Sequence, residues 1–402
     1  MTGSSYIRRM PLPPSISGTK GRLITRLDME LTERCNNDCV HCYINRPADD
    51  PSINQELAFD KIQTILEEAL CLGCQNIRFT GGEPLLREDF EQIYVYAKKL
   101  GLRVEIFTNG TRITPQLARI LSRFPAGHPL QISLYGKDQK TYESISRTPD
   151  SYKAVLKGID LLTTYKIPFV INPVLLPLSK GTFLAFEAWA ESRKDLNILK
   201  PQVTTLHLRC RGRDVQRNEE IKTFRIAPSL QLELESRDQR AQIDGLKAFC
   251  SRFCQVHGTA LFRCNAGINK GCADAYGKLQ MCLLLRHPDT VYDLGKGSLH
   301  DAFRQFFPKV RQLEAQDKLY HERCAHCFLV DLCEQCPAVS WMEERKLDGW
   351  LEHFCRLTHA QARLIGLLAE GEKSWMVADW QHRVKDLQRP SLTTRQPASA
   401  QV

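Results

Sequence analysis

The sequence predicts an α/β fold with a parallel sheet, because six strand-like segments alternate with helical segments along its first half. Six such units are fewer than the eight that close a full barrel, so we expect a partial (β/α)6 barrel. A second dense group of cysteines begins at residue 264, which predicts that a small cysteine-rich α+β domain follows the barrel.

The strand candidates are short runs in which apolar residues alternate or cluster. The first run, 23–31, alternates Leu23, Leu27, Met29 and Leu31 with polar neighbours and ends at a cysteine-rich loop. The later candidates are 76–80, 103–108, 130–134, 169–172 and 203–208.

The segments between the strands carry apolar residues at helical spacing. The helix candidates are 57–72, 88–100, 114–124, 151–165 and 183–194. Thr114 followed by Pro115 is typical of an N-cap and a first helical position, and Gly73 and Gly101 follow the ends of two candidates.

Bulk composition excludes several classes of protein. The 402 residues are 43% hydrophobic and 25% charged, as in ordinary soluble proteins of two domains. No apolar run reaches membrane-spanning length and no nucleic-acid-binding module is recognisable. The net charge of +9 is modest, and we expect its densest basic spot, 209–213, to be a solvated face, with contact to an acidic peptide or phosphate as the alternative. Residues 1–20 lack the apolar core of a signal peptide, so a cytoplasmic location is expected.

Three cysteines after the first strand carry the strongest chemical signal. Cys35, Cys39 and Cys42 are spaced so that one short loop can hold all three thiolates around one metal centre. A cubane iron–sulfur cluster normally takes four cysteines, so a triplet suggests that one iron is left open for a ligand that is not protein. Zinc is the competing interpretation, although structural zinc sites close with four ligands. Three buried thiols are the third alternative.

A second motif stands about forty residues later, after the second strand candidate. Gly81 and Gly82 permit a tight backbone and close ligand approach, and Glu83 offers an acceptor for a cationic group. Because the chemistry of parallel barrels lies at the C-terminal ends of the strands, the cysteine loop and this motif are expected at the same edge. An ordinary strand-to-helix turn is the alternative.

Together the two motifs resemble those of the radical S-adenosylmethionine (SAM) enzymes. The signature of that family is C-x3-C-x2-C with an aromatic residue before the last cysteine, a position that His41 fills, followed by a GGEP motif. The resemblance implies the partial barrel of that fold, a 4Fe-4S cluster whose open iron is chelated by SAM, and reductive cleavage of SAM to a 5′-deoxyadenosyl radical. It assigns the SAM amino group to Gly81, Gly82 and Glu83.

The same resemblance suggests further SAM contacts at the strand ends. Ser133 and Arg147 are candidates for the SAM carboxylate, and Asn109 is expected near the same pocket. A plain Asn-Gly turn at 109–110 and a surface role for Arg147 are the alternatives.

The downstream cysteines resemble the SPASM extension, which holds two further 4Fe-4S clusters. Cys264, Gly277 and Cys282 fit its C-x(9–15)-G-x4-C element, and the later cysteines fit its second element except that two residues, not three, separate Cys333 from Cys336. The resemblance implies one four-cysteine set made of Cys264, Cys272, Cys282 and Cys336, in which the ligation of Cys272 and Cys336 is open. It implies a second set made of Cys324, Cys327, Cys333 and Cys355. A zinc site built from two C-x2-C pairs is the alternative.

The expected function follows from this resemblance. SPASM-bearing enzymes mostly modify peptides or proteins, including ribosomally made peptides, so a peptide or protein substrate is favoured. A small molecule such as a sugar, an aminoglycoside or a tetrapyrrole-derived compound is the second possibility, and a non-enzymatic zinc or electron-carrier protein is a distant third. An external electron donor of the flavodoxin or ferredoxin type is implied, with a separate peptide-recognition protein as a further partner.

The sequence also predicts domain boundaries and assigns the remaining cysteines. We expect an extension over 1–21, the barrel over 22–235, the SPASM domain over 236–360, and a C-terminal helix with a disordered tail over 361–402. Cys71, Cys74, Cys210, Cys250 and Cys254 are expected mainly to pack in the interior.

Overall fold

The computed structural model describes residues 23–176, 180–199, 202–203, 206–212, 214–235 and 239–387. The predicted extension over 1–21 and the predicted disordered tail lie outside these residues. The chain forms two compact units, each assembled from several segments. Unit 1 comprises 1–226, 261–313 and 337–347, and unit 2 comprises 227–260, 314–336 and 348–402. The linear domain boundaries expected from the sequence stay predictions.

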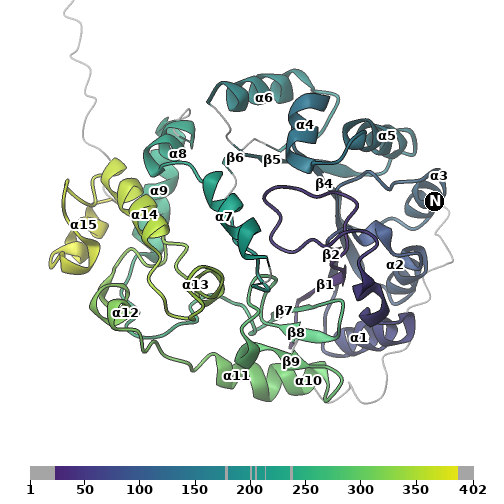
Figure 1. Cartoon of the computed structure of the whole chain (residues 1–402). Helices are drawn as coiled ribbons and strands as arrows, with labels where there is room; N and C mark the ends of the chain where they lie inside the picture. Colours follow the sequence, from purple (N-terminus) through teal and green to yellow (C-terminus); the bar gives the residue numbers. More distant parts are fainter. Residues whose placement is uncertain are drawn as a thin grey trace, which may run out of the picture. The chain divides into compact units, whose positions relative to one another are not determined.

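Unit 1 is built on a sheet to which nine strands of the described residues contribute, in the order β6-β5-β4-β3-β2-β1-β7-β8-β9 (Figure 1). Strands β1 to β7 pair in parallel, whereas β8 and β9 are antiparallel to their neighbours. The strands are β1 (Arg26–Thr32), β2 (Asn76–Gly81), β3 (Arg103–Thr108), β4 (Leu130–Leu134), β5 (Phe169–Leu175), β6 (Gln202–Val203), β7 (Lys270–Ala273), β8 (Lys278–Gln280) and β9 (Tyr292–Asp293). The predicted α/β class with a parallel core is confirmed.

Helices follow the first five parallel strands, as the alternating pattern predicts. Helices α1, α2, α3 and α5 lie along the outer side of the sheet, and the loop after β1 lies on its inner side (Figure 1). The helices of unit 1 are α1 (Phe59–Cys71), α2 (Phe90–Lys99), α3 (Pro115–Arg123), α4 (Gln139–Ser146), α5 (Ser151–Thr164), α6 (Lys180–Ser192), α7 (Val215–Thr223), α10 (Leu299–Asp301), α11 (Phe307–Val310) and α13 (Pro337–Glu344). Thr114 caps α3 by accepting a hydrogen bond from the backbone N–H of Leu117, as predicted.

The core of unit 1 fixes where the strands end. Ile77 and Phe79 of β2 are fully buried, and Val104 of β3 and Leu66 of α1 pack without exposure. Successive side chains of a strand point to opposite faces of the sheet, so a slip of one residue would expose these buried side chains. Their burial therefore favours one pairing register between neighbouring strands.

Unit 2 is helical in its described part. It contains α8 (Pro228–Glu235), α9 (Gln239–Phe253), α12 (Lys318–Glu322), α14 (Glu352–Leu364) and α15 (Trp380–Asp386). Cys250 and Cys254 lie in its apolar core with Phe328 and Leu367. The expectation that these two cysteines pack in the interior is confirmed.

Candidate functional site

The three cysteines of the first motif share one loop that leaves the C-terminal end of β1. Cys39 is buried, and Cys35 and Cys42 are half-buried. Backbone N–H groups donate to two of the thiols, from Asn37 to Cys35 Sγ at 3.4 Å and from Asn45 to Cys42 Sγ at 3.3 Å. Burial raises the pKa of Cys39 to about 12 and that of Cys35 well above its ordinary value. Since a metal ligand is a thiolate, these protons must leave when metal binds.

The end of β2 lies directly against this loop. Gly81 has φ +127°, and a Cβ there would meet the carbonyl oxygen of Thr32 at 2.0 Å. A Cβ on Gly82 would lie 2.2 Å from the carbonyl oxygen of Arg34, the residue before Cys35. Both positions therefore require glycine, and the reason is the close approach of two backbones.

Glu83 is fully buried and connects the ends of β2 and β3. Its carboxylate accepts hydrogen bonds from Thr108 Oγ1 at 2.7 Å, from the Asn109 N–H at 2.7 Å and from the Leu85 N–H at 3.0 Å. Burial raises the pKa of Glu83 to about 7. In this structure the carboxylate orders the two strand ends, and its role toward a SAM amino group stays a prediction.

Asn109 joins the cysteine loop to the end of β3. Its side-chain amide donates to Asn36 Oδ1 at 3.1 Å and reaches Cys35 Sγ at 3.7 Å, while its oxygen accepts from the backbone N–H of Thr111 at 3.0 Å. Asn109 therefore lies beside the cysteine loop, and its place near a SAM pocket stays a prediction.

The other sequence-predicted contacts lie around the same loop. The ring of His41 stands edge-on to Tyr135 with centroids 5.6 Å apart, and burial lowers the pKa of His41 to about 4. Ser133 is half-buried in β4 and lies opposite Asn172 of β5. Arg147 has a left-handed backbone and forms ion pairs with Glu220 and, at 3.9 Å, with Asp38 of the cysteine loop.

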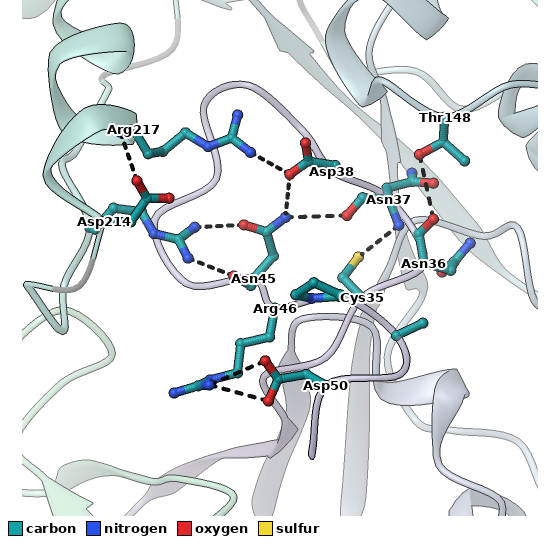
Figure 2. A pocket seen from close by; sticks show the side chains of 13 residues that line it. Cys35, Asn36, Asn37, Asp38, Asn45, Arg46, Asp50, Thr148, Asp214 and Arg217 are labelled. Carbon is teal, nitrogen blue, oxygen red and sulfur yellow. Dashed lines mark hydrogen bonds and ion pairs between the residues drawn. The ribbon is translucent and has the colours of Figure 1, made fainter. Parts of the chain in front are cut away.

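A cavity of about 490 Å³ opens beside Cys35 (Figure 2). Polar and charged side chains dominate its lining, and the cysteine loop, the segment around Thr148 and the start of α7 contribute them. The lining includes Asn36, Asn37, Asp38, Asn45, Arg46, Asp50, Thr148, Arg209, Asp214 and Arg217. It is large enough for a polar small molecule.

Arg209 holds the C-terminal end of the cysteine loop, a function that the sequence did not suggest. The guanidinium is buried and donates to the carbonyl oxygen of Cys42 at 2.8 Å, to Asn45 Oδ1 at 2.6 Å and to the Asn45 carbonyl oxygen at 2.6 Å. The expected solvated face at 209–213 is therefore wrong for Arg209. It is also wrong for Arg211, which pairs with two buried carboxylates, because the sequence alone does not show where the partners of these arginines lie.

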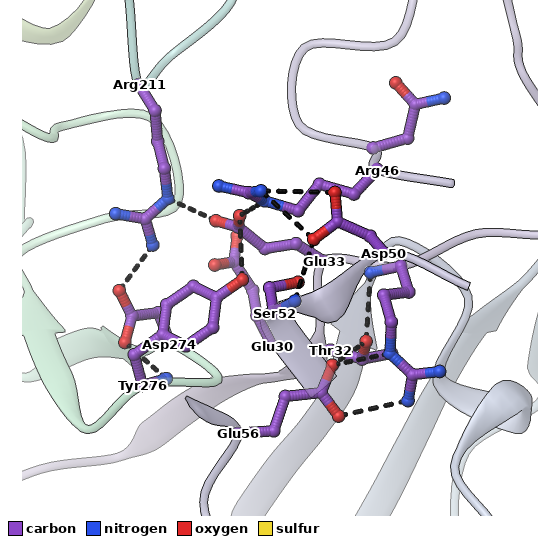
Figure 3. Close-up of polar contacts among 12 residues, drawn as sticks. Glu30, Thr32, Glu33, Arg46, Asp50, Ser52, Glu56, Arg211, Asp274 and Tyr276 are labelled. Carbon is purple, nitrogen blue, oxygen red and sulfur yellow. Dashed lines mark hydrogen bonds and ion pairs between the residues drawn. The ribbon is translucent and has the colours of Figure 1, made fainter. Parts of the chain in front are cut away.

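Those carboxylates, Glu33 and Asp274, are buried and belong to a cluster of charged side chains (Figure 3). Glu33 accepts from Arg211 and from Arg46, the latter at 3.1 Å, and Arg211 reaches Asp274 at 2.5 Å. The hydroxyl of Tyr276 donates to Glu33 at 3.2 Å. The cluster therefore ties the root of the cysteine loop to the segment after β7.

Unit 2 brings one complete predicted cysteine set together. Cys324, Cys327, Cys333 and Cys355 all line one cavity, which Trp350, Trp375 and Arg323 also border. The guanidinium of Arg323 stands 4.5 Å from the ring centre of Trp350 and 5.6 Å from that of Trp375. Four thiols that line one cavity beside two tryptophan rings provide the donor set that a closed 4Fe-4S cluster requires.

The other predicted set is not gathered in one unit. Cys264 is exposed, Cys272 is fully buried in β7 and Cys282 is half-buried, and these three belong to unit 1. Cys336 belongs to unit 2. Burial, followed by the charge of Glu30, raises the pKa of the Cys272 thiol. The ligation of this set stays a prediction.

The donor chemistry of the first loop also fits an iron–sulfur cluster. Within the described ranges, no three His, Cys, Asp or Glu side chains are arranged to hold one metal ion. A cubane does not require that arrangement, since each thiolate binds a different iron. Three thiols, two backbone N–H donors to sulfur and an adjoining cavity are consistent with such a group.

The family model of the Radical SAM superfamily matches residues 29–190, which include the end of β1, the cysteine loop, Gly81–Glu83 and strands β2 to β5. This part of the chain is therefore similar to the Radical SAM superfamily domain. Helices in the part of the chain that the structure describes are all too short or too polar to cross a membrane.

Several curated relatives are similar to this chain. The AdoMet-dependent heme synthase of Methanosarcina barkeri is 35% identical over 36% of this chain and 40% of its own length. That of Oleidesulfovibrio alaskensis is 26% identical over 77% of this chain and 81% of its own length. The PqqA peptide cyclase of Streptomyces rochei is 31% identical over 40% of this chain and 42% of its own length. The alignments at more than 30% identity thus span less than half of these relatives.

Solved structures share the fold. Streptococcus suis SuiB bound to the precursor peptide SuiA superposes with a TM-score of 0.60 at 15% identity, covering 84% of this chain and 76% of SuiB. The protein anSMEcpe with bound AdoMet and a peptide superposes with a TM-score of 0.56 at 17% identity, covering 85% and 98% of the two chains. The fold that this chain shares with SuiB and anSMEcpe therefore extends beyond residues 29–190.

Proposed function

We propose that this chain is a radical SAM enzyme that modifies a peptide or protein. The observation that carries the proposal is the cysteine loop itself, held by Arg209 and by Asn109 at the edge where β1, β2 and β3 end. When bound there, a 4Fe-4S cluster with SAM supplies reductive cleavage of SAM to a 5′-deoxyadenosyl radical, which abstracts hydrogen from substrate. Cys35, Cys39 and Cys42 are the proposed ligands.

The surrounding residues are proposed to bind and orient SAM. Glu83, together with Gly81 and Gly82, is proposed to bind the SAM amino group, and the two glycines let the end of β2 lie against the cysteine loop. Ser133 and Arg147 are proposed for the carboxylate. His41 and Tyr135 stand edge-on to each other, and the side chain of Tyr135 forms a hydrogen bond with Cys39. The lining of the cavity beside Cys35 contains acidic and basic side chains, which suits a ligand with both a positive and a negative charge.

We further propose that the downstream cysteines form a SPASM domain with two auxiliary clusters. The cavity shared by Cys324, Cys327, Cys333 and Cys355 supports the second of these. Support for the first comes from its sequence spacing. Iron–sulfur clusters require reduced thiols, so we propose a cytoplasmic location. Reductive cleavage of SAM requires an electron, so we propose an external donor of the flavodoxin or ferredoxin type.

A peptide substrate is supported by relatives and structural neighbours. PqqA peptide cyclase is named for a peptide, and SuiB was solved with its precursor peptide. By analogy, a separate peptide-recognition protein is proposed as a partner.

A tetrapyrrole-derived substrate is the second candidate, because one specific comparison favours it. The heme synthase of Oleidesulfovibrio alaskensis aligns over 77% of this chain, a much longer match than that of the peptide cyclase.

The chemistry is tested by replacing Cys35, Cys39 and Cys42 together by alanine. After anaerobic reconstitution, the variant should lose 5′-deoxyadenosine formation while it keeps the iron of the downstream sets. Cys71→Ala, a half-buried thiol outside all three sets, is the matched control and should retain activity. Unchanged 5′-deoxyadenosine in the triple variant would refute the assignment.

The substrate class is tested in the same assay. Short peptides encoded beside the gene and carboxylate-bearing tetrapyrroles are added separately, and the mass change of each is measured. A SAM-dependent mass change in a peptide supports the first proposal. Turnover of the tetrapyrrole alone would overturn it in favour of the second.

A further inference from the structure

Two buried side chains of unit 2 connect two of the proposed cluster ligands. The hydroxyl of Ser374 lies 2.9 Å from Cys327 Sγ, and the same hydroxyl lies 3.2 Å from His359 Nε2. On the other side of the ring, His359 Nδ1 lies 3.6 Å from Cys355 Sγ and 2.8 Å from the Cys355 carbonyl oxygen. A continuous polar path therefore runs from Cys327 to Cys355.

The direction of these hydrogen bonds follows from the backbone. The N–H of Ser374 lies 3.2 Å from His359 Nε2, and a backbone N–H can only donate. His359 Nε2 must then be the acceptor, so the one proton of the neutral ring is on Nδ1, where it is shared between the Cys355 carbonyl oxygen at 2.8 Å and Cys355 Sγ at 3.6 Å. Because Nε2 already accepts from the backbone of Ser374, the hydroxyl proton of Ser374 is available to Cys327. A thiolate at Cys327 carries no proton, so the hydroxyl has to be the donor.

The surroundings hold both donors in place. Ser374 is 1% exposed and His359 is 5% exposed, so water does not compete for these contacts. Cys355 and His359 are four residues apart in α14, which places them on one helix face. The ring of His359 also stands edge-on to Trp375, with centroids 5.4 Å apart, on the wall of the cysteine cavity.

We infer that Ser374 and His359 are positioning residues that donate hydrogen bonds to two thiolates of the second auxiliary cluster and thereby raise its reduction potential. This inference rests on the proposed presence of that cluster. Donors to the sulfur ligands stabilise the more negative, reduced state more than the oxidised state. Nothing in the cysteine spacing identifies them, since Ser374 lies 47 residues from Cys327.

The test uses the full-length chain with Cys35, Cys39 and Cys42 replaced by alanine, so that the first cluster does not contribute to the signal. Iron content and midpoint potentials are measured after anaerobic reconstitution, and the signal lost in Cys327→Ala identifies the relevant cluster. Ser374→Ala and His359→Leu remove one donor each. Ser374→Thr keeps the hydroxyl, and His359→Asn keeps an N–H donor near the Nδ1 position. His353→Leu, on the same helix with its ring against Phe354, is the matched control.

Each donor-removing variant should change the oxidised-to-reduced ratio at fixed potential by about tenfold, which is about 59 mV for a one-electron couple, toward lower potential. Ser374→Thr, His359→Asn and His353→Leu should stay close to the parent. Full iron with an unshifted potential in both donor-removing variants would overturn the inference.

Loss of iron is also decisive. If Ser374→Ala loses this cluster while Ser374→Thr retains it, the hydroxyl is required as inferred. If both lose it while unit 2 stays folded by circular dichroism, the hydroxyl is not the cause and the inference is wrong. A parent protein without this cluster would instead refute the proposed function, which separates the two failures.

Discussion

Gly82→Ala should release the cysteine loop from the sheet. The added Cβ would lie 2.2 Å from the Arg34 carbonyl oxygen, 2.5 Å from that of Glu33 and 2.6 Å from the Arg34 carbonyl carbon, closer than the 3.0 Å that real Cβ atoms essentially never cross. All three are backbone atoms, so no side chain can rotate away to relieve the contact.

The cost can be worked from the contacts that would break. Gly82 donates its N–H to the Thr32 carbonyl oxygen at 2.7 Å, and the Glu83 N–H donates to that of Arg34 at 2.8 Å. Overpacking costs about 1–3 kcal/mol, and each backbone hydrogen bond contributes about 1 kcal/mol. The sum of about 3–5 kcal/mol is a large part of an ordinary domain's stability of about 5–15 kcal/mol.

The assay combines anaerobic thermal unfolding with iron counting. At about 2–4 °C per kcal/mol, even the lower cost of about 3 kcal/mol should lower the Tm of unit 1 by about 6–12 °C. About four irons should be lost with the first cluster. Gly245→Ala is the matched control, since no atom lies within 4 Å of its added Cβ and alanine favours the helix α9. A Gly82→Ala protein with native Tm and full iron would show that the close approach of β2 does not hold the loop.

Three further predictions concern metal content, the arginine clamp and pH. One three-ligand and two four-ligand sets should bind about twelve irons per chain, and stoichiometric zinc with about four irons would contradict the auxiliary clusters. Arg209→Lys keeps the charge, but its single nitrogen cannot replace the two guanidinium nitrogens that reach Cys42 and Asn45, so it should cost about 1.5–3 kcal/mol and speed chelator removal of iron from the first cluster. An unchanged release rate would show that Arg209 does not restrain the loop. Burial raises the pKa of Glu83 to about 7 from the ordinary 4.5, so its contribution is fully present below about pH 4.5 and is lost as pH rises through about 7. The stability of the wild type relative to Glu83→Gln, measured by denaturant unfolding, should therefore fall between about pH 4.5 and pH 7, and a rising difference would refute this.

Local pattern was sufficient for the parallel half of the fold. The strands 103–108 and 130–134 match β3 and β4 to the residue, because each is a short apolar run between clear turn signals. Helix α4 was missed because its sequence is mostly polar and its buried face has only Tyr142, Ile145 and Ser146. Propensity alone does not identify a helix that is stabilised by tertiary packing.

Long-range pairing explains what the sequence could not give. Strand β7 is four residues long and pairs with β1, and its Cys272 was interpreted only as a ligand. Arg209 meets the cysteine loop across 164 residues. In both cases the local sequence is unremarkable, and the partner that gives the residue its function is far along the chain.

The position of β1 in the sheet has a consequence for synthesis. Strand β1 has two neighbours in the sheet. Strand β2 follows it closely in the sequence, whereas Lys270, the first residue of β7, pairs with Arg26 across 244 residues, the same separation as in the hydrogen bond between Thr25 and Asn269. At about 5–20 residues per second, a ribosome takes roughly 12–50 seconds to supply it. During that interval the strand that carries the cysteine loop has an open edge that can pair with another chain. Shielding of nascent chains is therefore expected to matter most before residue 270 emerges, and fragments that end earlier should aggregate through β1.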